Sequence, residues 1–287
     1  MDLNPPFPVL PGQGQYVSPE DNPGVLAATQ QVLANAIRST PMTPPEPNIV
    51  RLPGGVSVNG QWITEARVRE LNGADEEAIG RAAVSGLPEK IPDAILSCGV
   101  ISLGDNPVTP ALLDDMIIGD REALILGIRR VTYGKTIDFD PLTCRDCGTQ
   151  MVVKYDLADI PVKQLDAETN EFEVTLRDGR IATVRLATGG DQKAVMTASR
   201  AKELSTPEQQ TILLARTVLR ITSADGTQQT AFGTRQAQMM GAADRHAILR
   251  ELSERKIGPD HDQALINCTG CGEKVEVPVN IDTLFRD

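Results

Sequence analysis

Aromatic residues are scarce in this chain. They make up 3% of its 287 residues, and there is a single tryptophan. A surface that binds single-stranded nucleic acid by stacking needs several aromatic side chains, so the composition argues against one. Basic residues are also in the minority, because 28 lysines and arginines stand against 39 aspartates and glutamates, for a net charge of −11. A duplex-binding protein carries the opposite charge, so we expect no nucleic-acid partner.

Long apolar runs are absent from the sequence as well. No stretch approaches the ~18 consecutive apolar residues of a membrane-spanning helix. No apolar run follows a basic N-terminus, as it would in a secretory signal peptide. We therefore expect a soluble protein with no membrane partner, and nothing in the sequence points to an oxidising compartment in which structural disulfides would form.

The sequence contains none of the usual catalytic patterns. It has no Gly-x-Ser-x-Gly motif, no phosphate-binding loop and no dinucleotide-binding fingerprint. Of the two histidines, we expect His246 on a helix surface, whereas His261 precedes the nearest cysteine by seven residues and can at most support a metal ligand. The acidic clusters at residues 75–77 and 114–115 are expected on the surface. These observations predict that the chain is not an enzyme.

Four of the five cysteines form two Cys-x-x-Cys-Gly motifs, at residues 144–148 and 268–272. Four thiolates with this spacing are typical of a closed tetrahedral zinc site. Apolar and polar residues alternate after each motif, which predicts a half-buried strand. The pattern indicates a zinc ribbon that is split by a long insertion. It predicts one structural Zn²⁺ per chain, with four ligands: Cys144, Cys147, Cys268 and Cys271.

Other roles for these cysteines are less consistent with the sequence. A redox Cys-x-x-Cys motif of the thioredoxin type begins a helix, whereas each motif here leads into a glycine and a strand. Iron suits a four-cysteine site as well as zinc does, and zinc is preferred because no redox partner motif accompanies the cysteines. The fifth cysteine, Cys98, is expected to be a small buried apolar side chain.

The N-terminal segment has a composition of its own. Eleven of the 20 prolines lie in the first 53 residues. Proline fixes φ and lacks an amide donor, so residues 1–55 are predicted to form an extended arm. Within the arm, residues 25–38 carry an apolar stripe at helical spacing that includes Leu26, Leu33 and Ile37. A helix of this length is marginal alone, so we expect the stripe to bind a neighbouring subunit. The alternative is a disordered tail with a nascent helix.

The rest of the chain reads as an α+β fold. We predict a mixed, mainly helical region at residues 56–136, the two halves of the ribbon at 137–162 and 262–287, and an inserted β-hairpin and helical subdomain at 163–261. Local signals mark several elements in the first half: strands joined at Asn59-Gly60, a helix that starts within residues 71–75 with acidic residues in its first turn, a helix started by Thr109-Pro110, and a helix capped by Asp120 and ended by Gly134, with Arg129 and Arg130 solvated or salt-bridged. In the insertion they mark a hairpin at Asp178-Gly179, a helix beginning after Thr188, a helix from Thr206 through Ile221, and a helix at 242–255.

Several of these stretches resemble one family of tailed-phage proteins. They are residues 69–77, residues 119–134, and the two cysteine motifs, the second of which is followed by residues 281–285. The chain resembles T-even-type baseplate proteins of contractile tails, over about residues 62–287. The resemblance implies a structural baseplate component in the virion tail, assembled in the host cytoplasm with other tail and baseplate proteins in a symmetric multi-copy assembly. Two alternatives remain: an assembly chaperone that is absent from the mature virion, and a zinc-ribbon regulatory binding protein.

Overall fold

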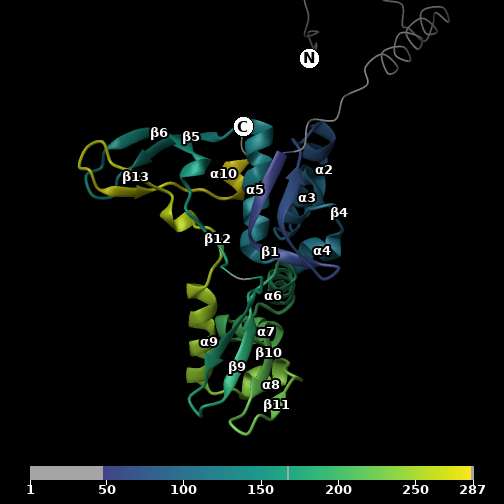
Figure 1. The fold of residues 1–287 in the computed structure, drawn as a ribbon. Helices are drawn as coiled ribbons and strands as arrows, with labels where there is room; N and C mark the ends of the chain where they lie inside the picture. Colours follow the sequence, from purple (N-terminus) through teal and green to yellow (C-terminus); the bar gives the residue numbers. More distant parts are fainter. Residues whose placement is uncertain (1–47, 167, 286–287) are drawn as a thin grey trace, which may run out of the picture. The chain divides into compact units, whose positions relative to one another are not determined.

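The structure is a computed structural model, and it describes residues 48–166 and 168–285 (Figure 1). Segment 25–38, with the predicted partner-binding residues Leu26, Leu33 and Ile37, lies outside the described residues. The described part mixes helices and strands, as the sequence predicts. None of its helices has the length and apolar character needed to span a membrane.

The first sheet is antiparallel, with four strands in the order β1-β2-β3-β4. The strands are β1 (Asn48–Val58), β2 (Gln61–Val68), β3 (Val100–Leu103) and β4 (Asn106–Pro107). The predicted turn joins β1 to β2, and Asn59 and Gly60 have φ values of 51° and 80°. Two successive positive φ values match the right-handed twist of a tight hairpin, which explains this Asn-Gly pair.

Strand β1 includes residues that the sequence places in the proline-rich arm. The strand begins at Asn48, and Leu52 is 2% exposed within the main core. Pro53 fits here because β1 is an edge strand whose register with β2 shifts between Arg51 and Val56. Proline is tolerated at such irregular edge positions, where no ladder hydrogen bond is lost. The predicted boundary at residue 55 therefore lies inside the strand.

Four helices accompany this sheet: α2 (Gly73–Val84), α3 (Lys90–Gly99), α4 (Pro110–Asp115) and α5 (Ile118–Tyr133). Two of the predicted helix starts are confirmed. The Asn72 side chain accepts hydrogen bonds at the start of α2 while the Asp75 carboxylate accepts the Asn72 N–H, and Thr109 caps α4 with Pro110 in the first position. Each side chain satisfies a backbone donor that the helix leaves unpaired.

Helix α5 differs from the prediction at two residues. Asp120 is not its N-cap, because the helix begins at Ile118 and the fully buried Asp120 accepts a 2.7 Å hydrogen bond from the Gly54 N–H. Arg129 is not solvated: it is 6% exposed and donates to the Gly134 carbonyl at 2.9 Å. A guanidinium can be buried where backbone carbonyls accept its hydrogen bonds. Gly134 ends the helix with φ 87°, as predicted.

Both cysteine motifs lie in antiparallel hairpins (Figure 1). The first hairpin consists of β5 (Thr136–Thr143) and β6 (Gln150–Asp156), and the second of β13 (Leu265–Asn267) and β14 (Lys274–Glu276). Exposed and buried residues alternate along β6, as predicted. Strand β14 is short, and Ile281 begins helix α10 (Ile281–Leu284) instead of continuing the strand.

Residues between the two hairpins form a second four-stranded sheet, with the order β11-β10-β9-β8, and four helices. These elements are β8 (Glu171–Thr175), β9 (Ile181–Arg185), α6 (Gly189–Lys202), α7 (Thr206–Thr217), β10 (Val218–Thr222), β11 (Gln228–Gln229), α8 (Thr234–Met239) and α9 (Ala242–Glu254). The predicted hairpin and helix starts are confirmed. The helix predicted through Ile221 ends at Thr217, because the β-branched residues that follow pair with β9.

Three separate apolar clusters hold the described part together. The largest joins the first sheet, its helices and the two cysteine hairpins, and it contains Cys144 and Cys268. The second lies between the second sheet and α7, α8 and α9. The third is small and contains three buried residues, Ile117, Leu186 and Ile257. It lies where short strands β7 (Val162–Lys163) and β12 (Gly258–Pro259) carry the chain into and out of the inserted part.

Candidate metal centre

The four cysteines of the two motifs converge on one point. Their Sγ atoms all lie within 4.8 Å of one another. The Cys144 and Cys271 sulfurs are 3.7 Å apart, and those of Cys147 and Cys268 are 3.6 Å apart. Four sulfurs at ~2.3 Å from a central zinc would be separated by about 3.8 Å in a tetrahedron. The residues present therefore fit a tetrahedral metal ion.

The two motifs have the same backbone geometry. In the first, the Cys144 N–H donates to the Thr149 carbonyl and the Gly148 N–H donates to the Cys144 carbonyl, both at 2.9 Å. In the second, the Cys268 N–H donates to the Glu273 carbonyl at 2.7 Å and the Gly272 N–H donates to the Cys268 carbonyl at 2.9 Å.

The glycine of each motif makes this tight turn possible. Gly148 and Gly272 have φ values of 72° and 81°, in the left-handed region that glycine adopts without steric cost. The turn brings both sulfurs of a motif to the same side. It also explains why each Cys-x-x-Cys is followed by glycine.

Burial differs between the two cysteines of each motif. Cys144 and Cys268 are 1% and 4% exposed and belong to the main core, whereas Cys147 and Cys271 are exposed. The first cysteine of each pair thus fixes the site to the core and the second closes it toward solvent. A metal ion held by all four cysteines would have no open position, which is typical of a structural metal and not of a catalytic one.

Electrostatics at the site favour a cation. The Thr149 hydroxyl, 3.2 Å from the Cys147 sulfur, stabilises the thiolate and lowers the pKa of Cys147 to about 6. The Glu273 backbone also favours the Cys271 thiolate, yet the neighbouring sulfur of Cys147 and the other two cysteines raise the pKa of Cys271 to about 12. Four thiolates repel one another unless positive charge lies between them. A divalent ion supplies that charge.

The other predicted candidates lie apart from the four cysteines. His261 makes no hydrogen bond to a cysteine in the described part of the chain; its Nε2 is 4.0 Å from Glu122 Oε2, and burial lowers its pKa. His246 is exposed on α9, as expected. Cys98 is half-buried in α3, where burial and the nearby Asp75 raise the pKa of its thiol. It is less buried than predicted.

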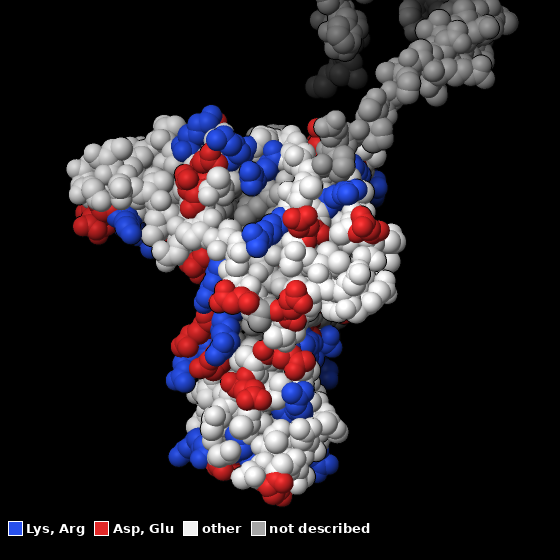
Figure 2. Space-filling model, in the orientation of Figure 1, with Lys and Arg blue, Asp and Glu red and all other residues white. Residues whose placement is uncertain are grey.

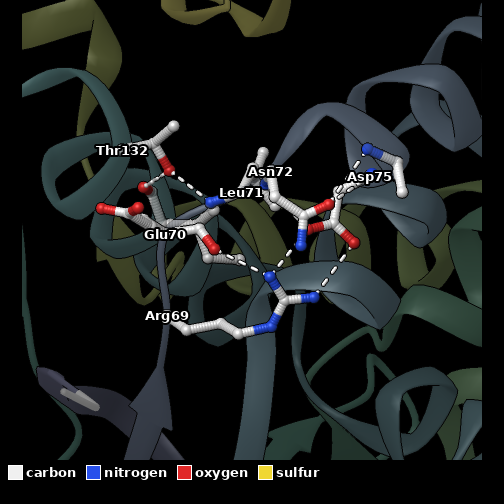
Figure 3. A network of polar contacts seen from close by, with 8 residues as sticks. Arg69, Glu70, Leu71, Asn72, Asp75 and Thr132 are labelled. Carbon is white, nitrogen blue, oxygen red and sulfur yellow. Dashed lines mark hydrogen bonds and ion pairs between the residues drawn. The ribbon is translucent and has the colours of Figure 1, made fainter. Parts of the chain in front are cut away.

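A polar network at the start of α2, shown in Figure 3, is not apparent from the sequence. Asp75, expected on the surface, is 9% exposed and binds Arg69 through two hydrogen bonds of 2.7 and 3.0 Å. The guanidinium lowers the pKa of Asp75. The Thr132 hydroxyl accepts the Leu71 N–H at 3.1 Å, so the network also ties this turn to α5. Residue spacing alone could not reveal these contacts.

The charges on the face of the described residues that Figure 2 shows do not form a continuous basic patch. On the face shown in Figure 2, lysine and arginine side chains alternate with aspartates and glutamates. Many of the basic groups are paired, as in Lys135–Asp156 at 2.9 Å and Arg180–Asp178 at 2.7 Å. This face therefore offers no continuous track for a phosphate backbone.

Comparison with known proteins gives one family match. Residues 52–213 match the family model described as T4 bacteriophage base plate protein. The match covers more than half of the chain and includes the first cysteine motif but not the second. No curated protein and no solved structure matches the chain.

Proposed function

The chain belongs to the T4 bacteriophage base plate protein family, and from this premise we propose that it is a structural component of a phage tail baseplate. Membership of the family supports a place in the virion tail, association with other tail proteins, and a structural rather than an enzymatic role. The paired surface charges favour this role over that of a regulator that binds nucleic acid.

The four-cysteine cluster supports a more specific role for part of the chain. Cys144, Cys147, Cys268 and Cys271 would hold one structural Zn²⁺ and complete a split zinc ribbon made by residues 137–162 and 262–287. Zinc bound there would join hairpin β5–β6 to hairpin β13–β14 and close the chain around the insertion, residues 163–261. The sulfur–sulfur distances of 3.6 and 3.7 Å carry this proposal.

The energy involved makes the metal important to the fold. Structural zinc contributes on the order of 10 kcal/mol to folding. The net stability of a whole domain is only ~5–15 kcal/mol. In this proposal the metal stabilises the base of the inserted part, whose own core is separate from the main one.

The N-terminal arm would provide the contact with neighbours. Its apolar stripe, with Leu26, Leu33 and Ile37, is too short to be stable as an isolated helix, so it would bind an adjacent subunit. Such a clamp, repeated around a symmetric multi-copy assembly, suits a component that stays in the particle. An assembly chaperone of the same family would instead be absent from the finished virion.

Mass spectrometry of purified particles, combined with elemental analysis of the recombinant chain, tests the proposal. We expect the chain in stoichiometric amount in the particles and about one zinc per chain. Zinc in the recombinant chain without the protein in particles would identify an assembly chaperone or a regulator. Protein in particles with no bound metal would reject the zinc ribbon but leave the baseplate role standing.

A further inference from the structure

The inserted part, residues 163–261, has little apolar contact with the rest of the described chain. Its core and the main core share no residue. Among the apolar clusters of the described residues, only the small third one connects the two, through buried Ile117, Leu186 and Ile257. Burial of apolar surface is the main force that fixes one part of a protein against another. These three side chains, with the partly buried Leu165 and Phe172, supply little of it.

The remaining contacts are backbone hydrogen bonds, such as that from the Gly189 N–H to the Met116 carbonyl at 2.9 Å, and ion pairs. Lys193 on α6 binds Asp93 at 2.8 Å and Asp114 at 2.7 Å, and Arg200 on α6 binds Glu89. In each pair the carboxylate belongs to residues 89–114 of the main body and the cation to the inserted part. We call these five residues the ionic latch: Glu89, Asp93, Asp114, Lys193 and Arg200.

The latch is open to solvent on one side. The side chains of Lys193 and Asp114 are each 34% exposed, and that of Arg200 is 40% exposed. A cavity of about 820 Å³ with a mixed polar and apolar lining adjoins them, and its wall includes Asp114, Asp115 and Lys193. Ion pairs in contact with water are weak and are screened by salt. Salt should therefore weaken the latch.

The chain crosses between the two parts at a glycine pair. Gly119, in the first turn of α5, lies against Gly258 of β12, and a β-carbon on either would overlap the backbone of the other. The Ile118 N–H also donates to the Ala187 carbonyl, at 3.2 Å. This crossing is a narrow line of backbone contact rather than a broad packed face.

Space beside the crossing is left unfilled. An apolar cavity of about 300 Å³ lies between the start of α5 and helices α7 and α9, with Ile117, Leu213 and Leu252 in its wall. Protein interiors are otherwise close-packed, and a tightly packed junction resists displacement. A cavity at the junction gives these side chains room to repack when the inserted part turns.

We propose that the inserted part is a movable subdomain that turns about the Gly119–Gly258 crossing and is held in the observed position by the ionic latch. Two separate cores with only a narrow contact between them are typical of two rigid bodies joined by a hinge. Release of the latch frees α6 from α3 and α4 while both cores stay intact. The inference does not depend on the metal or on the proposed role in the baseplate.

Pulsed electron–electron double resonance, which measures the distance between two spin labels, tests this hinge on the full chain. Spin labels attached to genetically encoded azido residues at Val84 on α2 and Met239 on α8 would report the distance between the two parts. Both positions are suitable because they are 87% and 80% exposed and the cysteines stay untouched. At low salt we expect one narrow distance distribution, and at about 1 M salt, where the screening length falls to ~3 Å, a broader one.

Charge reversal gives the decisive comparison. Arg200→Glu should broaden the distribution, and Glu89→Arg in the same chain should restore it, because the reversed pair re-forms the contact. Lys135→Glu is the matched control: it makes the same charge change at Lys135–Asp156, outside the latch, and should leave the distance unchanged. Thermal unfolding of each variant separates release of the latch from misfolding. A distribution that stays narrow in Arg200→Glu and in high salt would overturn the proposal.

Discussion

Gly258 lies against Gly119 with no room for a side chain on either residue, where the chain leaving the inserted part crosses the first turn of α5. A side chain at either position would have to displace backbone atoms and would therefore lower the stability of the protein.

Gly119→Ala should destabilise the protein by about 2 kcal/mol or more, because the backbone at Ile257 must move to admit the methyl group. Urea unfolding followed by circular dichroism measures the change. Gly80→Ala is the matched control, since Gly80 is also helical but has open space around it. The free energy of unfolding of that variant should rise by up to about 1 kcal/mol, because alanine has a higher helix propensity than glycine. Equal effects of the two substitutions would contradict the close crossing.

Cys144→Ser and Cys268→Ser should each abolish stoichiometric zinc binding and lower stability by several kcal/mol, since three thiolates no longer close the site. A strong chelator should lower the melting temperature of the natural chain in the same way. Cys98→Ser is the control, because this thiol lies outside the cluster. Metal content comes from elemental analysis and stability from thermal unfolding. Wild-type zinc content and melting in both ligand variants would rule out the structural metal.

Asp75→Ala should cost about 2–3 kcal/mol, because it removes the capping contact with Asn72 and leaves the partly buried Arg69 guanidinium without its carboxylate. Glu77→Ala removes a carboxylate from the same helix at an exposed position, and we expect less than about 0.5 kcal/mol from it. Chemical denaturation of both variants gives the comparison. A small effect at position 75 would mean that water replaces the carboxylate at no cost.

The contribution of Glu122 to stability should fall as the pH rises from about 4.5 to about 7. Burial raises the pKa of Glu122 from 4.5 to about 7, so in this window the folded protein holds a proton that the unfolded chain has released. Glu122→Gln should remove this dependence and stabilise the protein at pH 8 by on the order of 1–3 kcal/mol. Denaturation curves at several pH values would show it. A slope that persists unchanged in the variant would assign the effect to other groups, such as Asp120.

Removal of residues 1–47 should leave a folded, metal-binding chain that no longer enters the particle, because the described strands and cores begin at Asn48. Complementation of a deletion phage, followed by mass spectrometry of the particles, measures incorporation. Replacement of Leu26, Leu33 and Ile37 by serine tests the apolar stripe without shortening the chain. Normal incorporation of both variants would show that the arm is not the clamp.

The elements that could be predicted from the sequence are those set by local chemistry. Asn59-Gly60 and Asp178-Gly179 specify tight turns through the backbone freedom of glycine, and Thr109-Pro110 specifies a helix start through a side-chain cap. The cysteine spacing likewise identifies residues that meet in space, because two Cys-x-x-Cys motifs are the usual ligand pattern of a four-cysteine site.

The features that were missed depend on contacts distant in sequence. Val218–Thr222 continues an apolar helical pattern and becomes a strand only because β9 offers it a partner. From the sequence, Asp120 is interpreted as a helix cap and Arg129 as a solvated or salt-bridged side chain, whereas inside the fold Asp120 accepts the Gly54 N–H and Arg129 donates to the Gly134 carbonyl. Periodicity reports which residues share a face, but it does not report which polar atoms meet across the core.

The two cysteine motifs are far apart in the sequence, so the first is synthesised well before the second. Cys147 precedes Cys268 by 121 residues, which at ~5–20 residues per second takes the ribosome about 6–24 s. Throughout that interval the first motif would have only two of the four proposed ligands, while the inserted part could already begin to fold. A chain whose translation ends before the second cysteine motif would have only the two thiols of the first motif. The four-cysteine site can therefore be completed only after the ribosome has translated the whole insertion.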